Sequence, residues 1–414
     1  MSASVSKGPS TPGEIAEFQG LYGSFHVSEV LLQKIWLRQQ FATLQARTTD
    51  GDPIVIRSPG RWNRLAGPDF QAARLIIGEK PVTGAIEVHF RAQAWTQHHH
   101  DRDPAYDEVV LHVVLFPPEA GQAHAKTSKG RRIPTLVLID LLWCDLEEYA
   151  EEEAVATLAG RDAMPVLEEL LGLEEQARIA FLAESMERRW REKVRFARLR
   201  VDRLGWSDAC HQTALEILGY RQNRVAMLRL ASRWSHQMWK TAPPSMDEAL
   251  ASAQEEWATR GVRPANHPRR RVGQYASWMR SVPDWPDRLR AFPLAEDGVA
   301  GSQNSRTVTS LRRVLHCKEF RARIASDLLA GAVSGTRLDT LVVDLVLPFM
   351  AAAGRDEAAF PQWRVWYPGD MPEWLREAAR HLSPGEGRAP LHNGLLQAVF
   401  GRLLEGLRRE SGRG

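Results

Sequence analysis

Short apolar segments separated by turn residues run through the first third of the chain, and their alternation of apolar and polar positions is typical of β-strands. Before them, apolar residues recur at helical spacing behind Ser28, a favoured capping residue, which predicts a helix over 28–41. The predicted strands are 53–57, 72–77, 84–91, 109–116 and 133–139, with a short helical turn within 98–107. Up to residue 116 this order, a helix, three strands, a helix and a strand, predicts an α/β domain.

The pattern changes near residue 145, where apolar positions three and four apart predict helices instead. The predicted helices cover 167–204, 209–234, 340–353 and 391–409, with proline-rich breaks between some of them. A chain of 414 residues is longer than one ordinary core, so two domains are expected. We therefore predict a loose leader at 1–24, an α/β domain at 25–142 and an all-α domain at 143–414.

The composition favours a cytoplasmic protein with no membrane partner. Hydrophobic residues make up 43% of the chain and charged residues 25%, and no apolar run has the length of a membrane span. The cysteines Cys144, Cys210 and Cys317 lie far apart and offer no disulfide framework. A net charge of +3 permits a polyanionic partner without indicating one. The composition leaves the oligomeric state open.

The strand predicted at 84–91 carries an unusual set of polar side chains on one face. Side chains alternate along a strand, so Glu87, His89 and Arg91 lie on the same face. Asp69 begins the preceding strand, and neighbouring strands lie about 4.8 Å apart. Asp69 and Glu87 are therefore predicted to hold Mg²⁺ or Mn²⁺, because magnesium usually binds through one or two carboxylates. The plainer alternative makes Asp69 a turn residue and Glu87 a solvated strand residue.

The order of elements, with Pro68-Asp69 followed by Glu87-x-His89 on the next strand, resembles the PD-(D/E)XK nuclease superfamily. The resemblance implies a restriction-endonuclease-like αβββαβ core and metal-dependent hydrolysis of DNA or RNA. It also implies that Asp69 and Glu87 are metal ligands and that Glu29, on the first helix, is an accessory acid. His89, the third catalytic candidate, stands where the superfamily usually has lysine. Arg91 or Lys80 would then supply the missing charge, or the site would bind nucleic acid without cleaving it.

A run of histidines follows the strand, and a further histidine interrupts the apolar strand at 109–116. In an extended segment, His98 and His100 point the same way and could form a zinc site with His112, although their spacing matches no standard zinc signature. Zinc is therefore less expected than magnesium or manganese, and a histidine-rich hydrolase acting on a small molecule is the alternative. Supporting or substrate-contacting roles are predicted for Asn63, Arg91, His98, His100, Asp103, Tyr106 and His112.

Basic residues gather at two places in the helical half, with aromatic side chains between them, as expected of a surface that follows a phosphate backbone. The predicted nucleic-acid-binding residues are Arg188, Arg191, Arg195, Arg198, Arg269 and Arg270. The more common explanation of such a pattern is a solvated helix face whose charges pair with acids one turn away.

Several segments together resemble an uncharacterised bacterial family, domain of unknown function 2851. The resembling segments include 31–36, 60–63, 67–70 and 84–89 in the first half, and 218–223, 263–268 and 343–349 in the helical half. The resemblance spans most of the chain and implies no activity, since none is established for the family. The leading hypothesis, a metal-dependent nuclease, thus rests on the residues of the first domain. The alternatives are a nucleic-acid-binding protein without cleavage and a histidine-rich hydrolase acting on a small molecule.

Overall fold

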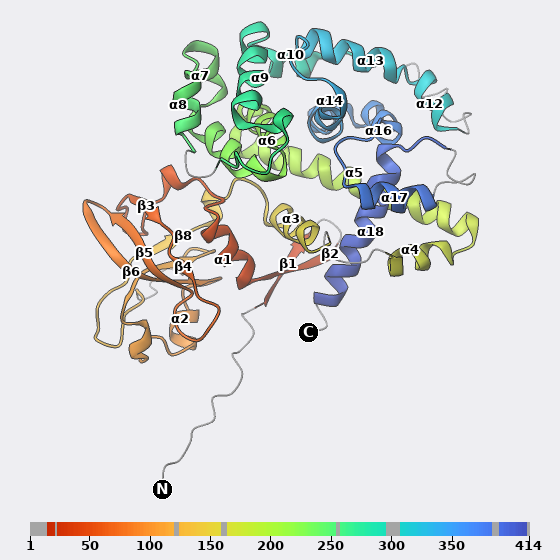
Figure 1. The fold of residues 1–414 in the computed structure, drawn as a ribbon. Coiled ribbons are helices and arrows are strands. Elements are labelled where there is room, and N and C mark those ends of the chain that lie inside the picture. Colours follow the sequence, from red (N-terminus) through yellow and green to blue (C-terminus); the bar gives the residue numbers. More distant parts are fainter. Residues whose placement is uncertain are drawn as a thin grey trace. The chain divides into compact units, whose positions relative to one another are not determined.

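The computed structural model describes residues 15–20, 23–119, 124–158, 164–253, 257–294, 307–382 and 389–411 (Figure 1). The chain divides into two compact units, residues 1–150 and 151–414. The first unit is mixed α/β and the second is helical. This is the division of secondary structure that the hydrophobic pattern predicts.

The first unit contains a hairpin, a larger sheet and short helices. Part of the segment predicted as a loose leader forms the first strand of the hairpin. The elements are β1 Ile15–Gly20, β2 Gly23–Ser28, α1 Glu29–Leu37, β3 Ile54–Ser58, β4 Arg61–Trp62, β5 Phe70–Ile77, β6 Lys80–His89, α2 Ala94–Gln97, a 3-10 turn Pro104–Tyr106, β7 Val109–Val114 and β8 Thr135–Val137.

The larger sheet has the strand order β3-β5-β6-β7-β8, and β4 pairs with the start of β5. Strands β3, β5 and β6 are antiparallel neighbours, whereas β7 is parallel to β6 and β8 is parallel to β7. Two parallel strands cannot be joined by a tight turn. The chain between β6 and β7 is therefore a crossover, and it contains α2 and the 3-10 turn (Figure 1).

Both faces of β6 are buried in its second half, residues 85–89. Ile86, Val88 and Phe90 belong to the main core of this unit, together with the apolar face of α1. The opposite face carries Glu87 and His89, which are only 5% and 2% exposed. The crossover covers this face, so the polar residues predicted from the sequence lie in an enclosed environment rather than on a solvated surface.

Gly84 permits a close approach between β6 and β7. A Cβ atom at this position would overlap the Val110 side chain and the Glu108 carbonyl oxygen. We expect Gly84→Ala to lower the free energy of unfolding by about 1–3 kcal/mol, as overpacking of a buried contact does. Urea unfolding followed by far-UV circular dichroism measures this change. An unaltered midpoint would mean that β7 moves away without cost.

Helices of very different lengths make up the second unit, and α3 begins at the end of the first. They are α3 Leu146–Leu158, α4 Met164–Leu171, α5 Glu175–Leu204, α6 Trp206–Arg233, α7 His236–Thr241, α8 Met246–Ala251, α9 Pro268–Ser281, α10 Trp285–Ala291, α12 Val308–Val314, α13 Cys317–Arg323, α14 Gly335–Leu341, α15 Leu347–Met350, α16 Asp356–Val365, α17 Glu373–Leu382 and α18 Asn393–Ser411.

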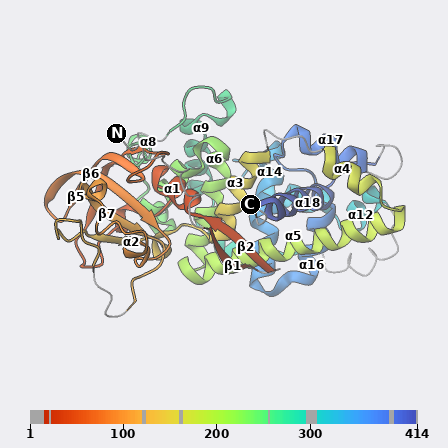
Figure 2. The same cartoon turned by 90° about the horizontal axis from the view of Figure 1, so that it is seen from below.

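The long helix α5 organises this unit: α6, α15 and α18 all pack against it, and Figure 2 shows α18 beside it. The predicted helix at 340–353 is interrupted, since π-helical turns at 342–346 and 351–355 flank α15. Within the described residues, no helix combines the length and apolar character that crossing a membrane requires. The three cysteines are buried, and none of them forms a disulfide bond.

Acid should destabilise the helical unit because it contains buried neutral histidines. Burial, and then the neighbouring His236, lowers the pKa of His211 to about 3, below the ordinary value of 6.5. The stability that depends on neutral His211 is therefore complete above pH 6.5 and is lost as the pH falls towards 3. We expect a slope of up to about 1.4 kcal/mol per pH unit. Urea unfolding between pH 7 and 5 should show a shallower slope in His211→Gln than in the wild type, with the partly exposed His267→Gln as the control.

Candidate metal centre

The pairing of β5 with β6 brings the two predicted acids together. Phe70 faces Ile86 in the antiparallel register, so Asp69 and Glu87 are the next pair. The Asp69 backbone N–H donates to Oε2 of Glu87 at 3.0 Å. The Val88 N–H donates in turn to Oδ2 of Asp69 at 2.9 Å. The two carboxylates therefore converge at one end of the sheet.

A β-bulge lies immediately beside this pair. The register between β5 and β6 shifts by one residue between Phe70 and Ala73, and Ala72 has a φ of 55°. A left-handed backbone is uncommon for a residue other than glycine. Such bulges are over-represented near active sites, where they re-aim neighbouring side chains.

Asp69 is held from the α1 side by a residue that the sequence did not indicate. Nε2 of Gln33 donates to Oδ1 of Asp69 at 2.7 Å, and Oε1 of Gln33 accepts from Nε1 of Trp62 at 3.0 Å. Glu29, the predicted accessory acid, is the buried first residue of the same helix, one turn before Gln33. Helical spacing from Glu29 is the signal that would have pointed to Gln33.

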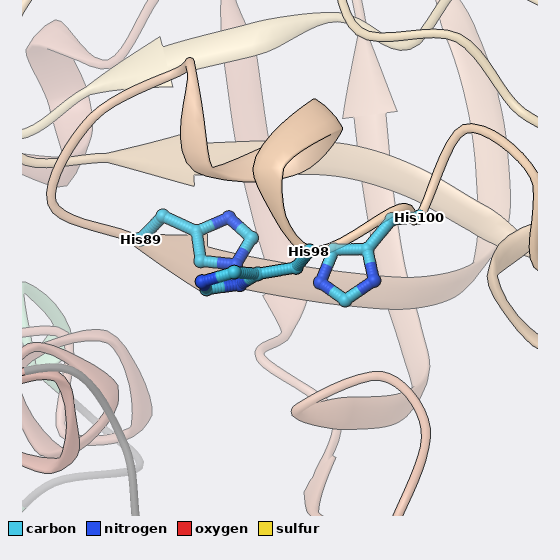
Figure 3. Close-up of side chains that lie close together, drawn as sticks. All are labelled: His89, His98 and His100. Atoms are coloured by element: carbon cyan, nitrogen blue, oxygen red, sulfur yellow. The ribbon is translucent and has the colours of Figure 1, made fainter. Parts of the chain in front are cut away.

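Three histidines gather next to Glu87. His89 comes from the end of β6, whereas His98 and His100 come from the crossover just after α2 (Figure 3). One ring nitrogen from each lies within 4.8 Å of the others. Oε1 of Glu87 lies 3.6 Å from Nε2 of His89 and 3.4 Å from Nε2 of His100. The three imidazoles thus meet, and the Glu87 carboxylate lies beside two of them, His89 and His100.

Burial sets the protonation of these groups. It raises the pKa of both Asp69 and Glu87 well above the ordinary carboxyl range, and for Asp69 the neighbouring Glu87 adds to the shift. Burial lowers the pKa of His89 far below 6.5 and that of His100 to about 4. The imidazoles of His89 and His100 are therefore neutral at pH 7, which is the form that binds a metal ion. The buried acids would gain from a nearby cation.

Two further predicted residues support the imidazoles. Nε2 of His112, fully buried on β7, lies 2.9 Å from Nδ1 of His89. This contact leaves Nε2 of His89 directed at Glu87. The ring of Tyr106 stacks on His100 with centroids 3.7 Å apart. Burial and the carboxylates of Glu87 and Asp69 raise the pKa of the Tyr106 hydroxyl, which therefore stays protonated.

Other predicted residues lie around the centre with structural contacts. Asn63 donates to the carbonyls of Ala66 and Pro68 and so shapes the loop that leads to Asp69. The Asp103 side chain accepts from the Ala105 N–H and caps the 3-10 turn.

Among the described residues, neither candidate for the missing lysine charge forms an ion pair with Asp69 or Glu87. The Arg91 guanidinium lies 5.1 Å from the centre of the Phe116 ring. Lys80 is at the opposite end of β6, seven residues from Glu87, and that spacing corresponds to about 23 Å along a strand.

Many of the predicted nucleic-acid-binding arginines form ion pairs within the helical unit. Arg188 pairs with Glu405 and Glu184, and Arg191 pairs with Glu187 one turn away. Arg269 pairs with Asp247 on the surface. Of the others, Arg195 lies over the ring of Phe196, and Arg198 and Arg270 are exposed.

Comparison with known proteins identifies the family of the chain but assigns it no activity. The family described as "Protein of unknown function (DUF2851)" matches residues 29–251, which is more than half of the chain. This segment contains all the residues of the candidate centre. No curated protein and no solved structure matches the chain. The chain therefore belongs to the DUF2851 family, as the resemblance of its sequence segments implies.

Proposed function

We propose that the α/β unit is a metal-dependent hydrolase that cleaves phosphodiester bonds in nucleic acid. The observation that carries the proposal is the meeting of His89, His98 and His100. Glu87 lies beside His89 and His100, and the Asp69 backbone N–H donates to Glu87. These residues would hold one divalent ion. When bound, such an ion polarises a phosphoryl oxygen and activates water at neutral pH.

The spacing of the donor atoms fits a metal ion. Tetrahedral coordination at about 2.0–2.1 Å separates the ligand atoms by about 3.4 Å. The Glu87 oxygen lies 3.6 Å from the His89 nitrogen and 3.4 Å from the His100 nitrogen. Imidazole donors suit Mn²⁺ or Zn²⁺ better than Mg²⁺, which prefers oxygen. We therefore propose Mn²⁺ or Zn²⁺ as the bound ion, whereas the sequence favoured Mg²⁺ or Mn²⁺ over Zn²⁺.

Side chains around the ion would accept and donate the protons that hydrolysis requires. Gln33 and the Val88 N–H orient Asp69, whose carboxylate would accept a proton from the attacking water. The protonated Tyr106 hydroxyl would donate to a phosphate oxygen. The enclosed face of β6 keeps bulk water away and strengthens each of these interactions.

Two observations bear on the substrate. Three strands in antiparallel order followed by a parallel strand, with the acids at one sheet end, are consistent with the nuclease-like core implied by the sequence. In contrast, the internal pairing of Arg188 and Arg191 removes part of the expected phosphate-binding surface. A small-molecule phosphodiester is therefore the second candidate.

The test uses the full-length protein freed of metal and reloaded with Mn²⁺, Zn²⁺ or Mg²⁺. We expect one Mn²⁺ or Zn²⁺ per chain and cleavage of single- or double-stranded oligonucleotides that disappears in Glu87→Gln. Cleavage of bis(p-nitrophenyl) phosphate without cleavage of oligonucleotides would favour the small-molecule substrate. Oligonucleotide binding without any turnover would favour the binding module, and failure to bind any of the three ions would contradict the proposal.

His112 offers a test of how His89 is oriented. His112→Leu removes the hydrogen-bonding ring but keeps an apolar side chain of similar bulk in a buried position. We expect the affinity for Mn²⁺ or Zn²⁺ to fall about 10–100-fold, because partners of metal-binding histidines have effects of that size. Isothermal titration calorimetry measures the affinity, and unfolding of the metal-free protein checks that the variant folds. Unchanged affinity in a folded variant would remove His112 from the centre.

A further inference from the structure

Two arginines far apart in sequence are buried in the same region of the helical unit. Arg271 belongs to α9 and Arg337 to α14, and both helices pack against α6. The two residues are 8% and 6% exposed. Arginine keeps its charge in proteins, so a buried guanidinium requires compensation by polar or anionic partners.

The partners of Arg271 are neutral. Its guanidinium donates to Oδ1 of Asn266 at 2.5 Å and to Oε1 of Gln274 at 2.9 Å. Its Nε is buried without an acceptor. Within the described parts of the helical unit, no carboxylate oxygen lies within ion-pair distance of Arg271. Arg271 therefore has no directly paired carboxylate among the described residues.

Asp370, the acid that acts electrostatically on Arg271, already forms an ion pair with Arg337. Oδ2 of Asp370 lies 3.1 Å from Nη2 of Arg337, and Oδ1 accepts from the Thr336 hydroxyl at 2.7 Å. Nε of Arg337 is also buried without an acceptor. Burial, and then repulsion by Arg337, lowers the pKa of Arg271 to about 10. One carboxylate therefore balances two neighbouring guanidinium groups.

A break in α6 shapes the same region. Tyr220 has a φ of 55°, a left-handed conformation that costs free energy for a tyrosine. The break lies just after Ile217, whose carbonyl accepts from Nη1 of Arg337 at 2.8 Å. The Arg337 guanidinium lies 4.6 Å from the centre of the Tyr220 ring. Tyr220 is 40% exposed, which places this region at the surface.

We infer that Arg271 and Arg337, beside Tyr220, bind the phosphate group of a small molecule. Two buried guanidiniums, each with an Nε donor that lacks an acceptor, offer an oxyanion both positive charge and hydrogen-bond donors. Their low exposure fits a small ligand rather than a polymer. The site also unites the segments 218–223 and 263–268, which the sequence singled out and the candidate metal centre leaves unused. It does not depend on the proposed function of the α/β unit.

The test measures binding of orthophosphate to the full-length protein at constant ionic strength set with chloride. We expect one phosphate per chain by calorimetry and a rise in the melting temperature with phosphate concentration. Arg271→Met should lower the phosphate affinity about 10-fold or more, because it removes charge-assisted hydrogen bonds. The control is Arg269→Met, which removes an exposed arginine two residues away and should bind phosphate as the wild type does.

A second readout separates ligand binding from a structural role. In phosphate-free buffer, Arg271→Met should melt at the wild-type temperature or above, because the substitution removes a buried charge that has no directly paired carboxylate. A lower melting temperature with unchanged phosphate affinity would overturn the inference. Absence of phosphate binding to the wild type would also overturn the inference. The same holds if a single-stranded oligonucleotide, and not orthophosphate, binds in a way that depends on Arg271.

Discussion

His98→Asn is expected to lower the affinity for Mn²⁺ or Zn²⁺ about 100-fold and to reduce hydrolysis by a similar factor at limiting metal. Four-ligand zinc sites bind with about 10–16 kcal/mol, so one ligand contributes about 3 kcal/mol, or two orders of magnitude. His98 is exposed, although one of its ring nitrogens belongs to the cluster with His89 and His100. Its replacement should therefore change metal binding with little effect on folding.

The next residue provides a matched control. His99 is also exposed and belongs to the same run of three histidines, but its ring is not part of the cluster. Its φ of 62° is tolerated by asparagine, so His99→Asn should fold normally. Calorimetry with each metal should show loss of affinity in His98→Asn alone. Equal affinities in the two variants would exclude His98 as a ligand.

Arg189→Met is expected to destabilise the helical unit by about 3–5 kcal/mol, the cost of leaving buried charges without their partner. The Arg189 side chain is 6% exposed and pairs with Glu151 at 2.6 Å and with Glu192 at 2.5 Å. These carboxylates raise the pKa of Arg189 above its ordinary value, against the effect of burial. Removal of the guanidinium leaves two enclosed carboxylates facing each other.

Two residues further along α5, the same substitution should have little effect. Arg191 pairs with Glu187, and both side chains are more than half exposed. An exposed ion pair contributes about 0–1 kcal/mol, so Arg191→Met should change stability by less than that. Urea unfolding of the two variants at pH 7 gives the comparison. Similar losses in both would mean that the enclosed network around Arg189 contributes no more than a surface pair.

Local pattern was sufficient to predict the secondary structure that carries the site. The alternation in 84–91 corresponds to β6, and the apolar run at 109–116 corresponds to β7. The turn between the second and third predicted strands sets their antiparallel register and places Asp69 and Glu87 on adjacent strands. The bulge between Phe70 and Ala73, which the sequence did not indicate, shifts this register by one residue, so that Asp69 faces Glu87.

The contacts of the histidines and arginines could not be predicted in the same way, since their partners lie far away along the chain. His89 and His112 are 23 residues apart, and they meet because β6 and β7 run parallel. Arg188 meets Glu405 across 217 residues. No periodic pattern encodes such a contact, so the basic positions along α5 resembled a phosphate-binding surface.

The sequence by itself determined the family, the change from strands to helices near residue 145 and the placing of two acids on adjacent strands. Each of these follows from local periodicity or from resemblance between segments. Only the tertiary structure decided that the crossover closes over β6, that His98 and His100 join His89 there, and that Gln33 holds Asp69. The physical reason is burial: packing against the crossover excludes water from Glu87 and His89 and determines their charge.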